Sequence, residues 1–227
     1  MAGIEPLRRF VCDLSRWVEQ IHDEAALIDA VRPGLAHLIA DDDWLPAACA
    51  QPHPVYYRQY LLHCDPLERF SVVSFVWGPG QRTPVHDHTV WGLVGILRGA
   101  ELCQPYAPDL QGWMQPHGPP HTLQRGDIEA VSPRLGDVHS VANALPDRLS
   151  ISVHVYGGNI GAVRRHVYLE PGAHNHAQGS GARGDAQVST ASPRVRPFIS
   201  GYSSATMPNL WDRSLGVLEG SGARGAP

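Results

Sequence analysis

The sequence predicts a mainly β fold, an antiparallel sandwich or barrel preceded by a short helical region. After residue 66 the chain runs in short β-rich segments separated by Gly, Pro and Asp, and residues 150–156 alternate strictly between polar and apolar side chains. Many short strands with turns between them are typical of antiparallel sheets, because such strands need only tight connections. The expected strand segments are 70–77, 92–102, 121–132, 139–145, 149–157 and 164–169.

The first 50 residues are expected to form a helical region that packs on the β core. Between Glu5 and about Leu45, apolar residues recur at helical spacing, which predicts buried helix faces. Pro33 is expected to break the helical pattern before a last apolar group at residues 35–39, because proline cannot donate the backbone hydrogen bond. The apolar and aromatic stripe is interpreted as packing surface.

The remaining chain divides by composition. Residues 51–171 carry the β segments and form the expected core domain. Residues 172–196 are rich in Gly, Ala and Ser, which predicts a flexible insertion. Large apolar side chains return in 197–213, which we expect to dock back on the core, and 214–227 is expected to be a disordered tail.

Composition and charge exclude several classes of function. The chain has 227 residues, 43% of them hydrophobic, which fits one main core. Its net charge of −4 offers no general attraction to nucleic acid or to anionic membranes. No run of about 18 apolar residues predicts a membrane span, and we expect a cytoplasmic protein. The four cysteines form no C-x-x-C pair and are expected to be reduced, structural thiols.

Three histidines have the spacing of metal ligands. His86 and His88 follow Gly80 in the pattern G-x5-H-x-H, and His139 lies in P-x2-G-x2-H-x3-N between Pro133 and Asn143. Residues i and i+2 of a strand project from one face, so His86 and His88 can reach the same ion. The two segments occur in order, about fifty residues apart, which strengthens the prediction of a shared site.

These two segments resemble the paired motifs of the cupin superfamily, which has a double-stranded β-helix, or jelly-roll, fold. The resemblance implies that the first motif supplies two histidine ligands and the second motif a third. Where the pattern usually has a glutamate, this sequence has Gly92 and Leu93, and Glu101 lies too far along to replace it. Three neutral ligands leave open positions on the ion and suit zinc with hydroxide as well as ferrous iron with oxygen.

A polar row and an arginine pair follow the third histidine. Ser152, His154 and Tyr156 alternate onto one face of a strand, which allows a hydrogen-bonded row that ends near the metal. A polar row satisfied within a barrel interior is the alternative interpretation. One guanidinium of Arg164 and Arg165 could turn inward and bind a substrate carboxylate, and alternation alone does not choose between them.

Five segments together resemble the bacterial thiol dioxygenases related to cysteine dioxygenase, most closely the 3-mercaptopropionate dioxygenase branch. They are YYRQYLLHCDP, FVWGPGQRTPVHDHTVWGLVGILRGAE, SPRLGDVHSVAN, SISVHVYGGNIGAVRRH and FISGYS with PNLWD. The resemblance covers roughly residues 55–170 and 197–212. It implies oxidation of a small thiol carboxylate by O2 to a sulfinate at a mononuclear Fe(II).

The resemblance also assigns roles to particular residues. It makes His86, His88 and His139 the iron ligands, places Ser152, His154 and Tyr156 around them, and makes Arg165 the partner of the substrate carboxylate. Animal cysteine dioxygenases carry a cysteine that can crosslink to the active-site tyrosine. Here Gly92 and Leu93 are the candidate positions, so no crosslink is expected.

Other interpretations stay open at this stage. A non-catalytic cupin that senses a small carboxylate ligand, or a zinc-binding cupin, would share the three histidines. 3-Mercaptopropionate and cysteine are both candidate substrates, and Arg58 or Gln59 lies where cysteine-specific relatives use an arginine.

Overall fold

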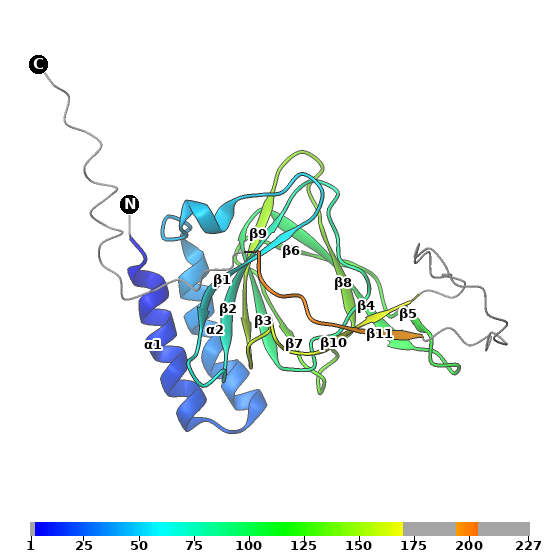
Figure 1. The fold of residues 1–227 in the computed structure, drawn as a ribbon, viewed down its shortest axis with the longest axis horizontal. Coiled ribbons are helices and arrows are strands. Elements are labelled where there is room, and N and C mark those ends of the chain that lie inside the picture. The colour runs from blue at the N-terminus through cyan, green and yellow to red at the C-terminus, as the bar shows by residue number, and fades with distance from the viewer. Residues whose placement is uncertain (1–2, 170–193, 204–227) are drawn as a thin grey trace, which may run out of the picture.

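The protein is a mainly β barrel with two helices packed on its outer surface (Figure 1). The computed structural model describes residues 3–169 and 194–203. The helices are α1 (Glu5–Gln20), α2 (Glu24–Ala40) and the short 3-10 helix η1 (Ala47–Ala50). The strands are β1 (Arg58–Cys64), β2 (Ser71–Trp77), β3 (Gly92–Arg98), β4 (Ala100–Pro108), β5 (Met114–Pro116), β6 (His121–Gln124), β7 (Ile128–Val131), β8 (His139–Asn143), β9 (Ser150–Tyr156), β10 (Arg165–Tyr168) and β11 (Val195–Phe198).

Two facing antiparallel sheets form the barrel. One sheet has five strands in the order β1-β2-β9-β3-β7. In the other, β4 pairs with β5, β6 and β8, and β10 pairs with β11. The backbone of His86 bridges to His139 of β8 and to Val167 of β10, which joins these two groups of strands. The predicted mainly β fold of the double-stranded β-helix type, with a helical N-terminal region, is confirmed.

The five-stranded sheet is buried on both faces, so β2 and β9 contain only buried residues. Its outer face packs against α1 and α2 in one apolar cluster, and its inner face lines the barrel interior in a second cluster. Gly95 allows α2 to approach closely, because a Cβ atom there would lie 2.9 Å from Cδ1 of Ile39. The helices therefore support the sheet that carries Ser152, His154 and Tyr156 on β9.

The prediction that Pro33 breaks the second helix is wrong. α2 continues through Pro33 to Ala40. Pro33 and Asp29, whose carbonyl group loses its helical donor, are both exposed, so water can replace the missing hydrogen bond. Beyond the proline, Leu35 and Leu38 are buried in the cluster shared with the sheet, which stabilises the last turns of the helix.

Each predicted strand segment contains a strand, but two of the segments are each divided into two strands. Segment 92–102 splits between β3 and β4, which belong to different sheets, and Gly99 makes the corner with a φ of 74°. Segment 121–132 likewise splits into β6 and β7. β1, β5 and β11 were not predicted as strands.

Part of the predicted domain organisation lies outside the described residues. This holds for the tail 214–227, for Leu210 and Trp211 of the docking segment, and for most of the proposed flexible insertion 172–196. The last residues of that insertion, Val195 and Arg196, pair with β10 as the start of β11. All four cysteines are free thiols, as expected. None of the helices in the described residues is long and apolar enough to cross a membrane.

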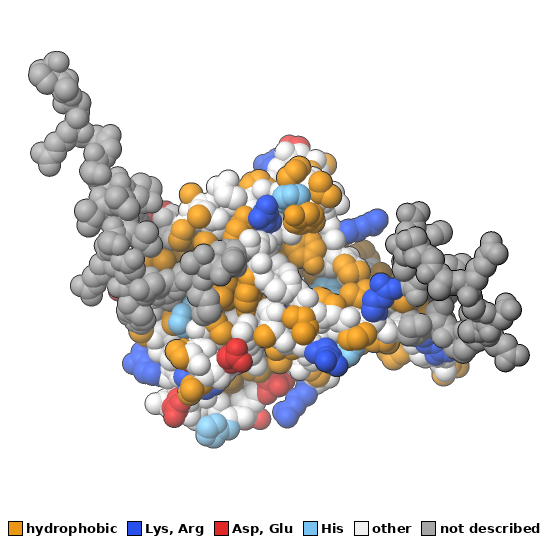
Figure 2. Space-filling view, viewed as in Figure 1, with side chains coloured by type: hydrophobic (Ala, Val, Ile, Leu, Met, Phe, Trp, Pro, Cys, Tyr) orange, Lys and Arg blue, Asp and Glu red, His pale blue; other side chains and the backbone are white. Residues whose placement is uncertain are grey.

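Figure 2 shows basic and acidic side chains scattered over the face in view, without a large patch of one sign among the described residues.

Candidate metal centre and cavity

The backbone fixes His86 beside His139. Their N–H and C=O groups exchange two hydrogen bonds of 3.0 Å, so the two side chains lie on the same face of the second sheet. The segment that carries His86 and His88 is not a regular strand, although their predicted side-by-side placement assumed strand geometry. It is extended and makes isolated bridges, because Pro84 cannot donate to a ladder and Thr89 turns the chain with a φ of 59°.

Asp137 holds the second histidine in place. Its carboxylate accepts hydrogen bonds from the backbone N–H of His88 at 2.9 Å and of Thr89 at 3.0 Å. It also accepts from Nδ1–H of His88 at 2.8 Å. Burial alone would raise the pKa of Asp137, but these bonds hold it below its usual value. Asp137 was not among the site residues predicted from the sequence, although its place two residues before His139 is a recognisable signal.

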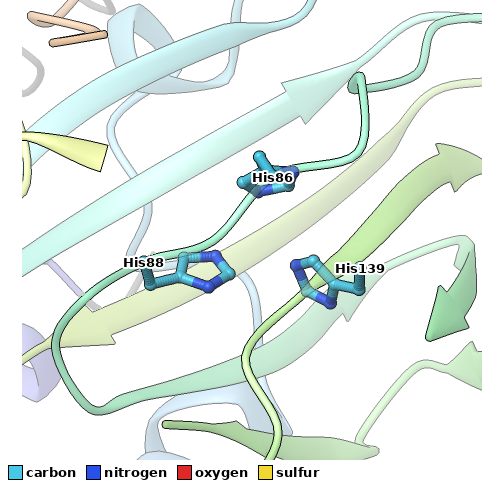
Figure 3. A group of neighbouring side chains, drawn as sticks. All are labelled: His86, His88 and His139. Carbon is cyan, nitrogen blue, oxygen red and sulfur yellow. The ribbon is translucent and has the colours of Figure 1, made fainter. Parts of the chain in front are cut away.

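The three histidines predicted as ligands converge in space. Their ring centroids lie 4.9 to 5.0 Å apart, and each offers a ring nitrogen within 4.8 Å of the others. Figure 3 shows the rings of His86, His88 and His139 turned toward a common point. All three residues are buried, with exposed fractions of 7%, 2% and 7%.

The donor set fits a metal ion with three imidazole ligands. Nδ1–H of His86 donates to the carbonyl oxygen of Pro84 at 3.0 Å, and Nδ1 of His139 lies 3.4 Å from Sγ of Cys103. Because the Nδ1 atoms have these partners, the Nε2 atoms are available as ligands. Burial, then the charge of His88, lowers the pKa of His86 to about 3, and burial also lowers that of His139. Neutral imidazoles have the lone pair that a metal requires.

A cavity of about 570 Å³ opens over the three histidines. Its walls are largely aromatic and aliphatic. None of the described residues that line it is acidic, and Arg165 is the one permanently charged residue among them. The lining residues include Tyr57, Phe75, Trp77, Tyr156, Val167, Phe198 and Tyr202.

The predicted polar row is present on β9. The hydroxyl of Ser152 lies 2.8 Å from Nε2 of His154, and Nδ1 of His154 lies 2.7 Å from the hydroxyl of Tyr156. The ring of Tyr156 stacks on that of His88, with centroids 5.6 Å apart, so the row ends at the histidine cluster. Burial raises the pKa of Tyr156 and lowers that of His154, so the phenol keeps its proton and the imidazole stays neutral.

A buried carboxyl group that was not predicted from the sequence lies near the Ser152 end of the row. Glu101 on β4 has no exposed surface and accepts from the hydroxyl of Ser150 at 3.2 Å. Burial raises its pKa to about 7, although both serine hydroxyls lower it. Glu101 and Cys103 are both buried on alternate positions of β4, but the contact of Glu101 with β9 depends on how the chain turns at Gly99, which alternation does not predict.

The structure places the two neighbouring arginines differently. Arg164 is exposed, whereas Arg165 is 3% exposed and lines the cavity. The Arg165 guanidinium lies over the ring of Phe198 at 4.7 Å and donates to the hydroxyl of Ser200, and its Nε has no hydrogen-bond partner in the described part of the chain. Gln59 also lines the cavity, and its buried Oε1 has no partner there either.

Gly92 lies directly opposite Tyr156 in the β3–β9 pair. A Cβ atom at position 92 would lie 2.8 Å from Cδ1 of Tyr156 and 3.0 Å from Cγ2 of Val131. The glycine therefore leaves the space that the phenol ring fills, and this position carries no thiol.

The sequence matches no model of a known protein family. Solved structures with a similar fold include a Klebsiella pneumoniae protein described as having a double-stranded beta-helix domain, at 21% identity over 52% of this chain and 93% of that chain, with a TM-score of 0.40. A cupin-like protein from Thermotoga maritima is 20% identical over 51% and 80% of the two chains, with a TM-score of 0.38. A cupin superfamily protein from Desulfitobacterium hafniense is 14% identical over 52% and 94%, with a TM-score of 0.38.

Proposed function

We propose that this protein is an iron-dependent thiol dioxygenase that converts a small mercapto-carboxylic acid and O2 to the sulfinic acid. The observation that carries the proposal is one cavity in which three buried imidazoles face a buried guanidinium and a phenol. His86, His88 and His139 would hold ferrous iron. When bound, the iron would supply the redox chemistry that joins the thiol sulfur to oxygen.

Charge balance supports a substrate with two anionic groups. Three neutral histidines do not offset the charge of a dication, and Arg165 adds a further positive charge in the same buried cavity. A thiolate and a carboxylate on one small molecule would offset two of these three positive charges, one at the ion and one at the guanidinium. Since the guanidinium is planar, it can bind a carboxylate through two parallel hydrogen bonds.

The charges that line the cavity also favour 3-mercaptopropionate over cysteine. Cysteine adds an ammonium group, and none of the described lining residues supplies a carboxylate to pair with it. Of Arg58 and Gln59, the two residues in the region where cysteine-specific relatives use an arginine, the one that lines the cavity is Gln59, a neutral amide. The cavity thus suits a thiol carboxylate without an amino group.

The polar row positions a proton donor over the histidine cluster. Because Nδ1 of His154 lies against the hydroxyl of Tyr156 at 2.7 Å, the phenol is fixed beside His88. Ser152 in turn fixes His154 and accepts from Nε1–H of Trp77 at 3.3 Å. The phenol would stabilise the charge that develops on oxygen.

The test is oxygen uptake by protein loaded with Fe(II) under anaerobic conditions. We expect consumption of O2 and formation of sulfinate with 3-mercaptopropionate, less with cysteine, and least with cysteamine, which lacks a carboxylate. Protein loaded with zinc should be inactive. Absence of O2 consumption with every thiol would contradict the proposal and favour a zinc-binding or ligand-sensing role for the same centre.

A further inference from the structure

A second group of metal-binding side chains lies outside the cavity. Cys103, His121 and Glu129 offer a sulfur, a nitrogen and an oxygen atom that all lie within 4.8 Å of one another. Cys103 and His121 are directly opposite in the β4–β6 pair. Nε2 of His121 lies 3.2 Å from both carboxylate oxygens of Glu129.

The cluster spans the two sheets where their edges meet. Glu129 belongs to β7, the last strand of the five-stranded sheet, whereas the other two residues belong to the second sheet. The Cys103 thiol is fixed in the barrel wall at 2% exposure, while the side chains of His121 and Glu129 are 41% and 26% exposed. An ion could therefore enter from solvent and reach a buried sulfur ligand.

The donor set differs in kind from the three-histidine centre. A thiolate, an imidazole and a carboxylate are typical zinc ligands, and the two anionic groups balance the charge of a divalent cation. An ion that binds the sulfur as a thiolate would displace the thiol proton, which would pass to solvent.

We propose that Cys103, His121 and Glu129 form a second site for a zinc-like divalent cation, with water completing its coordination. The ion would tie the free edges of the two sheets together. It would also lie beside the first centre, since Sγ of Cys103 is 3.4 Å from Nδ1 of His139. The proposal does not depend on the thiol dioxygenase activity.

The test is an anaerobic titration of the metal-free protein with Co²⁺, a spectroscopic substitute for zinc. We expect two ions per chain and a near-ultraviolet thiolate-to-cobalt charge-transfer band, which histidine ligands cannot produce. The His86→Ala variant should bind one ion fewer and keep the band. The number of bound ions and the charge-transfer band together distinguish the second site from the first.

Three further variants make the assignment specific. Cys103→Ser should lose the band and one ion, whereas Cys64→Ser, which replaces another buried free thiol, should keep both. His121→Gln alters a partly exposed side chain and should lower the affinity of the second site for Co²⁺ at least tenfold. This variant provides a test even if Cys103→Ser does not fold. A single ion without the band in the unmodified protein would overturn the proposal. A band that persists in both Cys103→Ser and His121→Gln would do the same.

Discussion

The carboxyl group of Glu101 accepts a hydrogen bond from the hydroxyl of Ser150 at 3.2 Å in a part of the barrel where Glu101 has no exposed surface. Its other oxygen, Oε2, has no partner that meets the full hydrogen-bond geometry among the described residues. A buried carboxylate with so little compensation destabilises the fold, and burial accordingly raises the pKa of Glu101 to about 7.

The first prediction concerns stability and pH. The pKa of Glu101 is about 7 in the folded chain and 4.5 as its ordinary value, so the protonated form stabilises the fold below pH 4.5 and that contribution is lost as pH rises through 7. A shift of this size corresponds to roughly 3 kcal/mol. Glu101→Gln should therefore gain roughly that much relative to the unmodified protein between pH 5 and pH 8, measured by urea unfolding.

The exposed Glu5→Gln exchange is the control for this measurement and should show no such gain. If the difference between Glu101→Gln and the unmodified protein stays constant from pH 5 to pH 8, the buried carboxyl does not titrate as described.

The second prediction concerns the support of His88. Asp137→Asn keeps the shape of the side chain but removes the charge that accepts from Nδ1–H of His88 and from two backbone N–H groups. Loss of such a supporting carboxylate weakens metal binding by roughly 10- to 100-fold. Anaerobic Fe(II) titration should show this loss at the three-histidine centre, and the exposed Asp147→Asn should bind normally. Unchanged affinity in Asp137→Asn would mean that the carboxylate does not orient the ligand.

The third prediction uses the two adjacent arginines as a matched pair. Arg165→Ala should raise the KM for 3-mercaptopropionate roughly 10- to 100-fold, because a charge-assisted hydrogen bond in a buried site contributes about 1.5–3 kcal/mol. Its metal content should be unchanged. Arg164→Ala removes an exposed side chain and should leave KM as it is. Parallel loss of metal and activity in Arg165→Ala would indicate a structural role instead.

The fourth prediction concerns the space beside the phenol. Gly92→Ala places a methyl group 2.8 Å from Cδ1 of Tyr156, so the ring must shift from its present position against His88. We expect a loss of about 1–3 kcal/mol in the free energy of unfolding and a lower kcat with normal metal content. Gly158→Ala is the control, since a Cβ there would meet Cγ2 of Val163 at an ordinary 3.5 Å. Equal effects of the two changes would contradict this account.

The sequence predicted those parts of the fold and site that depend on local pattern. Strict alternation at residues 150–156 places Ser152, His154 and Tyr156 on one face, and the hydrogen bonds along β9 show that they lie there. The spacing of the two histidine motifs predicted that His86, His88 and His139 share one site, and the three rings converge in the barrel. Alternation did not choose between Arg164 and Arg165, because the burial of Arg165 depends on β11 and on Ser200 beyond it.

The missed features depend on contacts between distant segments. β1 contains the apolar run Tyr60 to Leu62 without clear alternation, so its pattern did not indicate a strand. Glu101 meets Ser150 because the corner at Gly99 carries the start of β4 past the start of β9. The continuation of α2 past Pro33 likewise depends on packing against the sheet, which outweighs one lost backbone hydrogen bond.

Oxygen isotope labelling tests the central claim most directly. Fe(II)-loaded protein should convert 3-mercaptopropionate under ¹⁸O2 to a sulfinate in which both sulfinate oxygen atoms are labelled, as mass spectrometry would show. Unlabelled sulfinate, a product with one oxygen from water, or unchanged thiol would contradict the assignment of a dioxygenase to this three-histidine centre.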